Sequence, residues 1–291
     1  MRKSKFKISI THLCKVAGVS RSGYYRYHSL TATLCRAYLE RQDLEARDDL
    51  LVAYHFKNRN KGARQIKMTL ENQFSRVMNL KKISRLMKKY DIICPIRRAN
   101  PYKKMMKATK DHRVVKNILN QQFEQATPGK VFLTDITYLF YGKGQKAYLS
   151  TIKDCATNEI VAYDISKNIM LDLVTETIQK LLDNPQVKIM PGAYIHSDQG
   201  AHYTSPCFQS LLKEKNLGQS MSRRGNCWGN APQESFFGHF KDEARIKKCQ
   251  TYDELKEEIN DYMDYYNNYR YQWGLKKMTP VQYRNHLLKV S

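Results

Sequence analysis

The chain has 291 residues, which is enough to bury a substantial core and suggests two or more domains. Its 50 Lys and Arg residues outnumber 27 Asp and Glu residues and give a net charge of +23, a bias that an enzyme for neutral small molecules does not need. Such a charge favours a polyanionic partner, and nucleic acid is preferred to a membrane because the sequence contains no amphipathic anchor and no apolar run of transmembrane length.

The positive charge is concentrated in the N-terminal part of the chain. Residues 1–125 hold 29 Lys and Arg residues against 9 Asp and Glu residues, a net charge of +20. Residues 126–291 hold 21 against 18, a net charge of +3. We therefore expect the N-terminal part to bind the polyanion and the remainder to form an ordinary globular domain.

Residues 1–30 predict a helix-turn-helix-like unit. Gly18 supplies a tight turn, and Ser20 is a good N-cap for a second helix over residues 21–27, which would bury Tyr24. The apolar side of the first helix comprises Ile10, Leu13 and Ala17. The second helix would enter the major groove of DNA and expose Arg21, Ser22 and Arg26. A small helical hairpin without a DNA-binding role is the alternative, and the exposed basic residues favour DNA.

Residues 31–95 predict a second helical DNA-binding unit. Gly62 precedes a helix that carries Ile66, and Asn79 caps a helix over residues 80–90. The apolar stripe of this last helix comprises Ile83, Leu86, Met87 and Tyr90. The basic residues that we expect to contact DNA phosphates are Arg64, Lys81, Lys82, Arg85 and Lys88. A basic helix face is usually only solvated surface, but its recurrence in a region of net charge +20 favours phosphate contact.

A change of pattern near residue 126 separates a basic linker, residues 96–125, from a globular core, residues 126–245. The linker is rich in Lys and Arg and has little apolar periodicity. In the core, three apolar segments separated by turn residues predict strands over 130–141, 146–154 and 159–166. Because short turns connect them, these strands are expected to form an antiparallel meander.

The rest of the core alternates helices and strands. The predicted elements are a helix over 170–183, a strand over 193–197, a helix that begins at Ser205-Pro206, a strand over 217–221 and a helix over 232–244. This order predicts an α/β fold with a mixed sheet and helices on its faces. Residues 246–291 are expected to form a helical C-terminal segment with an apolar stripe of Leu255, Ile259, Tyr262, Tyr266 and Tyr269. For Tyr265, Tyr271 and Trp273, packing or dimer contact is preferred to base stacking.

Three carboxylates lie on elements that converge in such a sheet. Asp135 lies inside an apolar strand, Asp198 ends another strand, and Glu234 lies in the first turns of a helix. Each alone has an ordinary explanation, as a turn cap, a polar core residue or a solvated side chain. Together they would repel one another unless cations lay between them, and Mg²⁺ fits because it accepts a few carboxylate oxygens and leaves sites for phosphate and water. A pair of such ions is suited to phosphodiester chemistry.

The motifs around these acids resemble those of a known family. The segments "TDITYL", "HSDQGAHYTS" and "NCWGNAPQESFFGHFK", with 35 residues between the second and third acids, resemble the DDE triad of transposases and retroviral integrases. The segments "GVSRSGYY", "GARQI", "ISRLMKKYDI" and "YYNNYRYQWGLKKMTPVQY" extend the likeness over nearly the whole chain. Together they resemble the second-frame product of the insertion-sequence-3 family.

This resemblance implies a ribonuclease-H-like core in which Asp135, Asp198 and Glu234 are the catalytic and metal-binding residues. It implies two Mg²⁺ ions, with Mn²⁺ as a substitute, that support nicking at insertion-sequence ends and transfer of the 3′-OH to another phosphodiester. The implied partners are double-stranded DNA (terminal inverted repeats and target), a second copy or more of the chain on DNA, and a first-frame protein or a frameshifted fusion with it. The expected location is the bacterial cytoplasm, at the nucleoid and not at a membrane. Seven scattered cysteines without a C-x-x-C pair favour reduced thiols there.

The third acid predicts one further contact. Lys241 lies seven residues after Glu234, almost two helical turns, so both side chains project from nearly the same face and we expect Lys241 to contact DNA. Two residues depart from the family pattern: Gly229 stands where Asp is common, which removes a possible cap beside Glu234, and Phe132 stands where Trp is common. His196 and His202 flank Asp198 and could touch the scissile phosphate, but polar packing at the strand end is preferred. Asp154 is expected to be structural or to support the residues of the site.

Two other functions remain open at this stage. A ribonuclease-H-type nuclease that only hydrolyses its substrate would leave the two helix-turn-helix-like units without a purpose. A non-catalytic DNA-binding repressor would leave the intact triad unexplained. An assay that follows both nicking and joining of labelled DNA ends separates all three.

Overall fold

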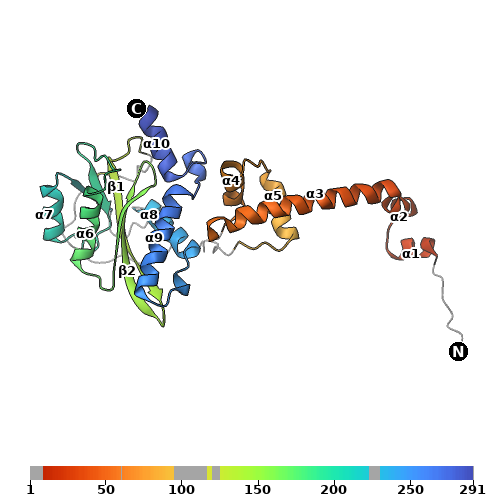
Figure 1. Cartoon of the computed structure of the whole chain (residues 1–291), viewed down its shortest axis with the longest axis horizontal. Coiled ribbons are helices and arrows are strands. Elements are labelled where there is room, and N and C mark those ends of the chain that lie inside the picture. Colours follow the sequence, from red (N-terminus) through yellow and green to blue (C-terminus); the bar gives the residue numbers. More distant parts are fainter. Residues whose placement is uncertain (1–8, 60, 95–116, 120–124, 223–229, 291) are drawn as a thin grey trace.

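A computed structural model of the chain describes residues 9–59, 61–94, 117–119, 125–222 and 230–290. A slender helical arm, built from residues 9–94, extends from an α/β core (Figure 1). The predicted linker lies almost wholly outside the described residues, as does Gly229. Within the described residues, no helix combines the length and the apolar character needed to cross a membrane.

The far end of the arm consists of two short helices, α1 (Ile10–Val16) and α2 (Arg21–His28). Ser20 caps α2 as predicted, since its hydroxyl accepts a hydrogen bond of 3.0 Å from the Gly23 amide, and Gly18 adopts a left-handed conformation (φ 64°) in the turn. The predicted core of this unit is wrong in detail. Leu13 is exposed and Tyr24 is only half-buried, whereas Cys14 is buried. Two helices this short have too little apolar surface to bury a core of their own.

The proximal part of the arm is a three-helix unit. Its helices are α3 (Leu30–His55), α4 (Ala63–Gln73) and α5 (Leu80–Lys89), with a 3₁₀ turn (Phe56–Asn58) after α3. Asn79 caps α5 as predicted, and the buried cluster includes Leu50, Ile66 and Leu86. The sequence did not predict that α3 is continuous over 26 residues; its first half projects beyond this cluster and carries α1 and α2 at its end (Figure 1).

The core contains one five-stranded sheet in the order β3-β2-β1-β4-β5. Its strands are β1 (Val131–Tyr141), β2 (Gln145–Asp154), β3 (Ile160–Ser166), β4 (Tyr194–Ser197) and β5 (Gly218–Met221). The first three are antiparallel, whereas β4 runs parallel to β1 and β5 parallel to β4. The predicted meander and mixed sheet are therefore confirmed.

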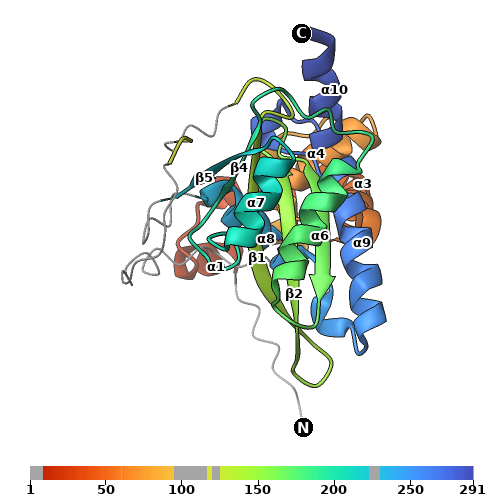
Figure 2. The same ribbon diagram turned by 90° about the vertical axis from the view of Figure 1, so that its left-hand side faces the viewer.

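Helices cover both faces of this sheet (Figures 1 and 2). The core helices are α6 (Leu171–Leu182), α7 (Pro206–Glu214), α8 (Ala231–Glu243), α9 (Tyr252–Asn268) and α10 (Pro280–Val290), with 3₁₀ turns at Ile246–Lys248 and Trp273–Leu275. One apolar layer joins α6 and α7 to the sheet, through residues such as Phe132 and Ile195. The other joins α8 and α9 to the opposite face, through Leu139 and Phe236.

The C-terminal segment packs as predicted and also holds the arm. Tyr265 and Tyr271 are buried, which confirms the packing interpretation, whereas Trp273 is exposed. The buried guanidinium of Arg59, just after the 3₁₀ turn of the arm, pairs with Glu258 and Asp261 of α9. The sequence did not predict this joint, in which Arg59 helps to tie the arm to the helical layer that covers one face of the sheet.

Candidate active site

Asp135 lies where β1 loses its partner on one side. The strand pairs with β2 along its whole length, with Asp135 opposite Thr151, but β4 pairs only with residues 131–133. The Asp135 side chain is half-buried, and its Oδ1 accepts a hydrogen bond of 2.8 Å from the Ile136 amide. This carboxylate therefore lies at the edge of β1 that β4 leaves unpaired after residue 133, next to the carboxyl end of β4. We call this place, around Asp135, the notch.

Asp198 comes directly after β4 and reaches the same notch, because β4 runs parallel to β1 and ends beside its middle. Its side chain is exposed, and its Oδ1 accepts a hydrogen bond of 2.8 Å from the Gly200 amide. Glycine leaves room for this carboxylate, since a Cβ at residue 200 would lie 2.9 Å from that oxygen and would displace it. The turn after the strand thus holds the carboxylate in place.

Glu234 is positioned by α8, whose first turn is fastened to the sheet. The side-chain amide of Asn230 donates a hydrogen bond of 3.0 Å to the backbone carbonyl of Thr134, the neighbour of Asp135. The Lys153 amine on β2 donates a hydrogen bond of 3.0 Å to the Pro232 carbonyl, and Gln233 donates to Thr151. These contacts fix the start of α8 against β1 and β2, so Glu234 faces the notch from an element remote in sequence.

The electrostatics of the three acids are coupled. Burial, together with the charges of Asp198 and Glu234, raises the pKa of Asp135 to about 7, against a smaller lowering by the Ile136 amide and Lys241. Burial and Asp198 likewise raise the pKa of Glu234. The predicted triad is therefore brought within electrostatic range, and negative charge on Asp135 and Glu234 is unfavourable there.

The donor set suits a hard divalent cation. Carboxylate oxygens are the ligands that Mg²⁺ prefers, and a bound cation would relieve the repulsion that raises the pKa of Asp135. Among the residues that the structure describes, no three His, Cys, Asp or Glu side chains are already close enough to enclose one ion. Mg²⁺ commonly keeps water and phosphate ligands, and one or two carboxylates suffice to hold it.

Tyr203 forms part of the buried wall near the acids. Its hydroxyl lies 3.4 Å from the Thr134 hydroxyl, and burial together with Asp135 raises its pKa well above the usual range. The phenol therefore stays protonated and adds no charge to the notch. His196, by contrast, is buried with Nδ1 2.9 Å from the Ser220 hydroxyl, which agrees with a structural role. His202 has its Nε2 3.4 Å from the Ile169 carbonyl.

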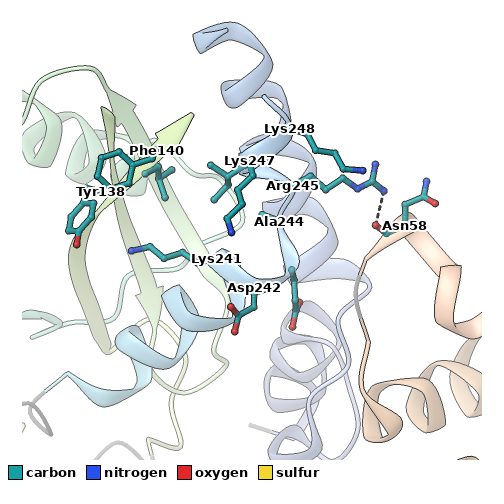
Figure 3. Close-up of a pocket in the computed structure, with 12 residues that line it drawn as sticks. Asn58, Tyr138, Phe140, Lys241, Asp242, Ala244, Arg245, Lys247 and Lys248 are labelled. Atoms are coloured by element: carbon teal, nitrogen blue, oxygen red, sulfur yellow. Dashed lines mark hydrogen bonds between the residues drawn. The ribbon is translucent and has the colours of Figure 1, made fainter. Parts of the chain in front are cut away.

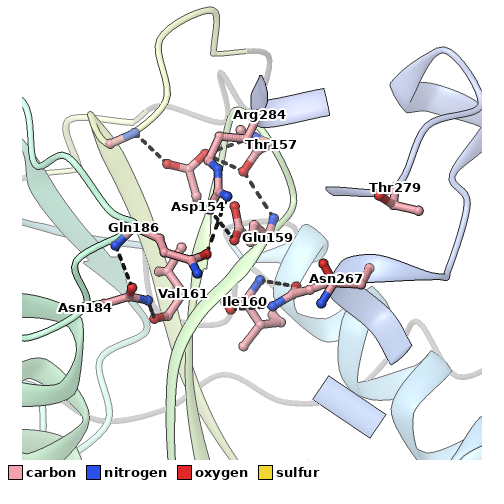
Figure 4. A network of polar contacts seen from close by, with 12 residues as sticks. Asp154, Thr157, Glu159, Ile160, Val161, Asn184, Gln186, Asn267, Thr279 and Arg284 are labelled. Atoms are coloured by element: carbon pink, nitrogen blue, oxygen red, sulfur yellow. Dashed lines mark hydrogen bonds and ion pairs between the residues drawn. The ribbon is translucent and has the colours of Figure 1, made fainter. Parts of the chain in front are cut away.

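Asp154 belongs to a turn rather than to the acid cluster. Its carboxylate accepts hydrogen bonds from the amides of Gly129 (2.6 Å) and Thr157 (2.9 Å) and from the Thr157 hydroxyl (Figure 4). Glu159, in the same network, pairs with Arg284 of α10 at 2.6 Å. This arrangement explains an acid in β2 without catalysis, as expected from the sequence.

Lys241 lies on the predicted side of α8. Its amine is 4.9 Å from the centre of the Tyr138 ring, and its charge lowers the pKa of Asp135. It lines a groove of about 610 Å³ between the far part of β1 and the end of α8 (Figure 3). The sequence analysis missed the other residues of this groove, because aromatic residues at alternate positions of a strand fit a buried face equally well.

The basic residues that we expect to contact DNA lie on the arm, apart from Lys241. The exposed members of the predicted DNA-contacting set on the arm are Arg21, Ser22, Arg26, Arg64, Lys81, Arg85 and Lys88, whereas Lys82 is partly buried. Arg85 makes a bidentate pair with Asp43 at 2.6 and 2.7 Å. This pair with a residue of α3 compensates the charge of Arg85, whose contact with DNA phosphate stays a prediction.

Comparison with protein families supports this division of the chain. Residues 125–227 match a family described as "Integrase core domain", and residues 234–288 match a second family of the same description. Residues 40–100 match a family described as "HTH-like domain", which corresponds to the proximal helical unit of the arm. The DNA-binding role of α1 and α2 stays a prediction.

Similar proteins extend the match over the whole chain. The putative transposase InsK for insertion sequence element IS150 of Escherichia coli is 31% identical over 281 residues, 95% of this chain and 93% of that protein. The IS600 31 kDa protein of Shigella sonnei is 30% identical over 94% of this chain and 97% of its own length. Transposase InsF of insertion sequence IS3A of E. coli is 26% identical over 98% of this chain and 97% of its own length. Among solved structures, the HTLV-2 integrase catalytic core domain in complex with magnesium aligns over 54% of this chain and 97% of its own length. The sequence identity of this alignment is 18%, and its TM-score is 0.40.

Proposed function

This chain belongs to the insertion-sequence-3 family of transposases, and we propose that Asp135, Asp198 and Glu234 are the residues with which it nicks and joins DNA. The enzyme is a DNA transposase with an integrase core. The observation that carries the assignment of its site is the convergence of the three acids on one notch, with the pKa of Asp135 raised to about 7 by burial and by the other two acids.

Two Mg²⁺ ions, or Mn²⁺ in their place, would be held by these three carboxylates. When bound, they supply an activated attacking oxygen and stabilise the leaving oxygen of a phosphodiester. The residues of the chain do the positioning. Asp198 is fixed by the Gly200 amide, and Glu234 by the contacts of α8 with β1 and β2. Lys241 contributes a positive charge beside Asp135, where it would contact a phosphate of the bound DNA.

We assign the binding of double-stranded DNA mainly to the arm, with terminal inverted repeats and target DNA as the substrates. The charge of +20 over residues 1–125, against +3 over the rest, supports this division. Assembly on DNA would involve at least two copies of the chain. A first-frame protein, or a frameshifted fusion with it, is the proposed protein partner, and the bacterial nucleoid the proposed place of action.

The test is a strand-transfer assay on labelled duplexes that carry the terminal inverted repeats of the element. With Mg²⁺ the chain should produce both nicked and joined DNA, and with EDTA neither. Asp135→Asn, Asp198→Asn and Glu234→Gln should each lower both products by roughly a thousandfold or more, since metal-assisted steps contribute several kcal/mol. DNA binding should be retained, because the arm is unchanged.

Matched variants and the pattern of products separate the alternatives. Asp154→Asn and Glu214→Gln serve as controls, one in a buried turn and one on the surface at the end of α7. Hydrolysis without joining would identify a ribonuclease-H-type nuclease. Binding without any Mg²⁺-dependent reaction would identify a repressor. Substantial nicking by any of the three triad variants would exclude that residue from the site.

A further inference from the structure

Two aromatic side chains of β1 are exposed close to the acids. Tyr138 and Phe140 project from the same face of the strand with 55% and 53% of their surface exposed. Their ring centres are 5.5 Å apart, in an edge-to-face arrangement. They lie in the part of β1 that β4 does not pair with, so the described strands leave one side of this segment open. Exposed apolar surface of this kind marks an interaction site.

Cations surround these rings. The amine of Lys146 lies 5.6 Å from the centre of the Tyr138 ring and 5.8 Å from that of Phe140, and the amine of Lys241 lies 4.9 Å from that of Tyr138. The groove lined by both rings is bordered on its other side by the basic residues Arg245, Lys247 and Lys248 (Figure 3). Its acidic residues are Asp242 and Glu243, and Glu243 is buried and paired with Arg270 at 2.8 Å. The accessible charge of the groove is therefore predominantly positive.

The groove lies within a few nucleotides of the acids. Tyr138 follows Asp135 by three positions on an extended strand, which corresponds to about 10 Å at about 3.3 Å per residue. Along one strand of DNA this is about three base steps, at about 3.4 Å per step. Because successive side chains of a strand alternate between its faces, Asp135 and Tyr138 project from opposite faces of β1, and a DNA strand held at the acids would reach the rings by crossing the edge of β1 that β4 leaves unpaired.

We propose that this groove binds unpaired nucleotides of the DNA strand that adjoins the scissile phosphate. Bases stack on Tyr138 and Phe140, and phosphates contact lysines of the groove, among them Lys241 and Lys247. Unpaired DNA is favoured over duplex DNA because a base exposes its face to a protein ring only when it has left the stack of the duplex. A duplex bound through its phosphates needs the lysines but not the rings. The proposal rests on the proposed function, since it assumes that DNA occupies the notch.

The experiment compares two DNA end duplexes with the full-length chain. One is blunt, and the other carries three unpaired nucleotides beside the cleavage site, one of them 2-aminopurine. Binding is measured in Ca²⁺ by titration, and stacking by quenching of 2-aminopurine fluorescence. Wild type should bind the unpaired substrate roughly tenfold more tightly than the blunt one, and should quench the probe.

Variants assign this preference to the rings. Tyr138→Ala and Phe140→Ala should each reduce the preference severalfold and weaken the quenching, whereas Tyr138→Phe should keep both because it keeps the ring. Trp273→Ala is the matched control, since this ring is also 50% exposed and has the Lys277 amine 5.4 Å from its centre, but lies outside the groove. It should behave as wild type.

The outcomes separate this proposal from the function on which it rests. If wild type binds and, with Mg²⁺, nicks the blunt duplex but shows no preference for unpaired nucleotides, the groove proposal is overturned and the transposase function stands. The same holds if both alanine variants keep the full preference. If wild type neither binds nor nicks either duplex, the proposed function itself has failed.

Discussion

Two lysines show how differently the arm and the core use charge. In the arm, Lys89 on α5 lies on the surface between Glu40 and Asp43, and hydrogen bonds to these acids raise its pKa. In the core, Lys153 on β2 is buried, donates to the Pro232 carbonyl, and has its pKa lowered to about 7, mainly by burial. The arm presents charge to water and to a partner, whereas the core places a few ionisable groups where they position other residues.

The arm and the core also differ in how much apolar surface they bury, and this difference fits their different roles. The arm buries one small cluster and leaves much of α3 exposed, so its shape suits an extended contact with DNA. The core has an apolar layer on each face of its sheet, which gives the acids a fixed frame. Single changes should therefore have large effects in the core and small, additive effects in the arm.

The largest effect is expected for the buried ion pair at the end of α8. Nε and Nη2 of Arg270 donate hydrogen bonds to the Glu243 carboxylate, and both side chains are buried. Glu243→Gln leaves the arginine without its counter-charge and should lower the free energy of unfolding by about 3–5 kcal/mol, measured by urea denaturation. Glu40→Gln, at an exposed pair of the arm, should change the free energy of unfolding far less, because water screens the pair. Equal losses at the two sites would contradict the contrast between the regions.

A pH-dependent effect of intermediate size is expected for Lys153. Between pH 7 and 10.5 its amine is neutral in the folded chain and protonated in the unfolded chain, so this residue makes stability rise with pH. The contribution is at most about 1.4 kcal/mol per pH unit, and it vanishes below pH 7, where both states are protonated. Lys153→Met should remove this slope. Urea denaturation of both proteins at pH 7, 8 and 9 would refute the account if the two stability curves ran parallel.

The smallest effects are expected in the arm. Lys88→Ala should lower the slope of log affinity against log salt concentration by about 0.9, the value for one lost phosphate contact. Arg85→Ala should change the slope less, because Asp43 already neutralises this guanidinium. Titration of an end duplex at four salt concentrations measures both. A larger change for Arg85→Ala would show that its pair with Asp43 opens on DNA.

The sequence predicted the parts of this molecule that depend on local pattern. Turn residues and alternating apolar segments predicted the order of strands and helices, and caps such as Ser20 and Asn79 predicted helix starts. Asp135, Asp198 and Glu234 could be identified because each lies in a distinctive segment, and the structure brings their charges together.

Contacts between distant segments could not be predicted in this way. The pairing of Arg85 with Asp43 and of Arg59 with α9 depends on how separate helices pack, which no local period encodes. The length of α3 was missed because the apolar residues of its first half, Leu30, Leu34 and Tyr38, are exposed and do not pack into the cluster that the sequence pattern indicated. Tyr138 and Phe140 fit a buried strand by composition, and their exposure depends on which elements cover that part of the sheet, which the local pattern does not give.

The central claim is that the arm supplies DNA affinity and the core supplies the reaction. It is tested most directly by measuring affinity for one end duplex, and the rate of Mg²⁺-dependent nicking at saturating protein, for Asp198→Asn and for the double variant Lys81→Ala/Lys88→Ala. We predict that Asp198→Asn binds like wild type without nicking, while the double variant needs more protein to saturate but then nicks at the wild-type rate. A double variant that saturates at the wild-type concentration, or an Asp198→Asn protein that loses its affinity, would contradict the account.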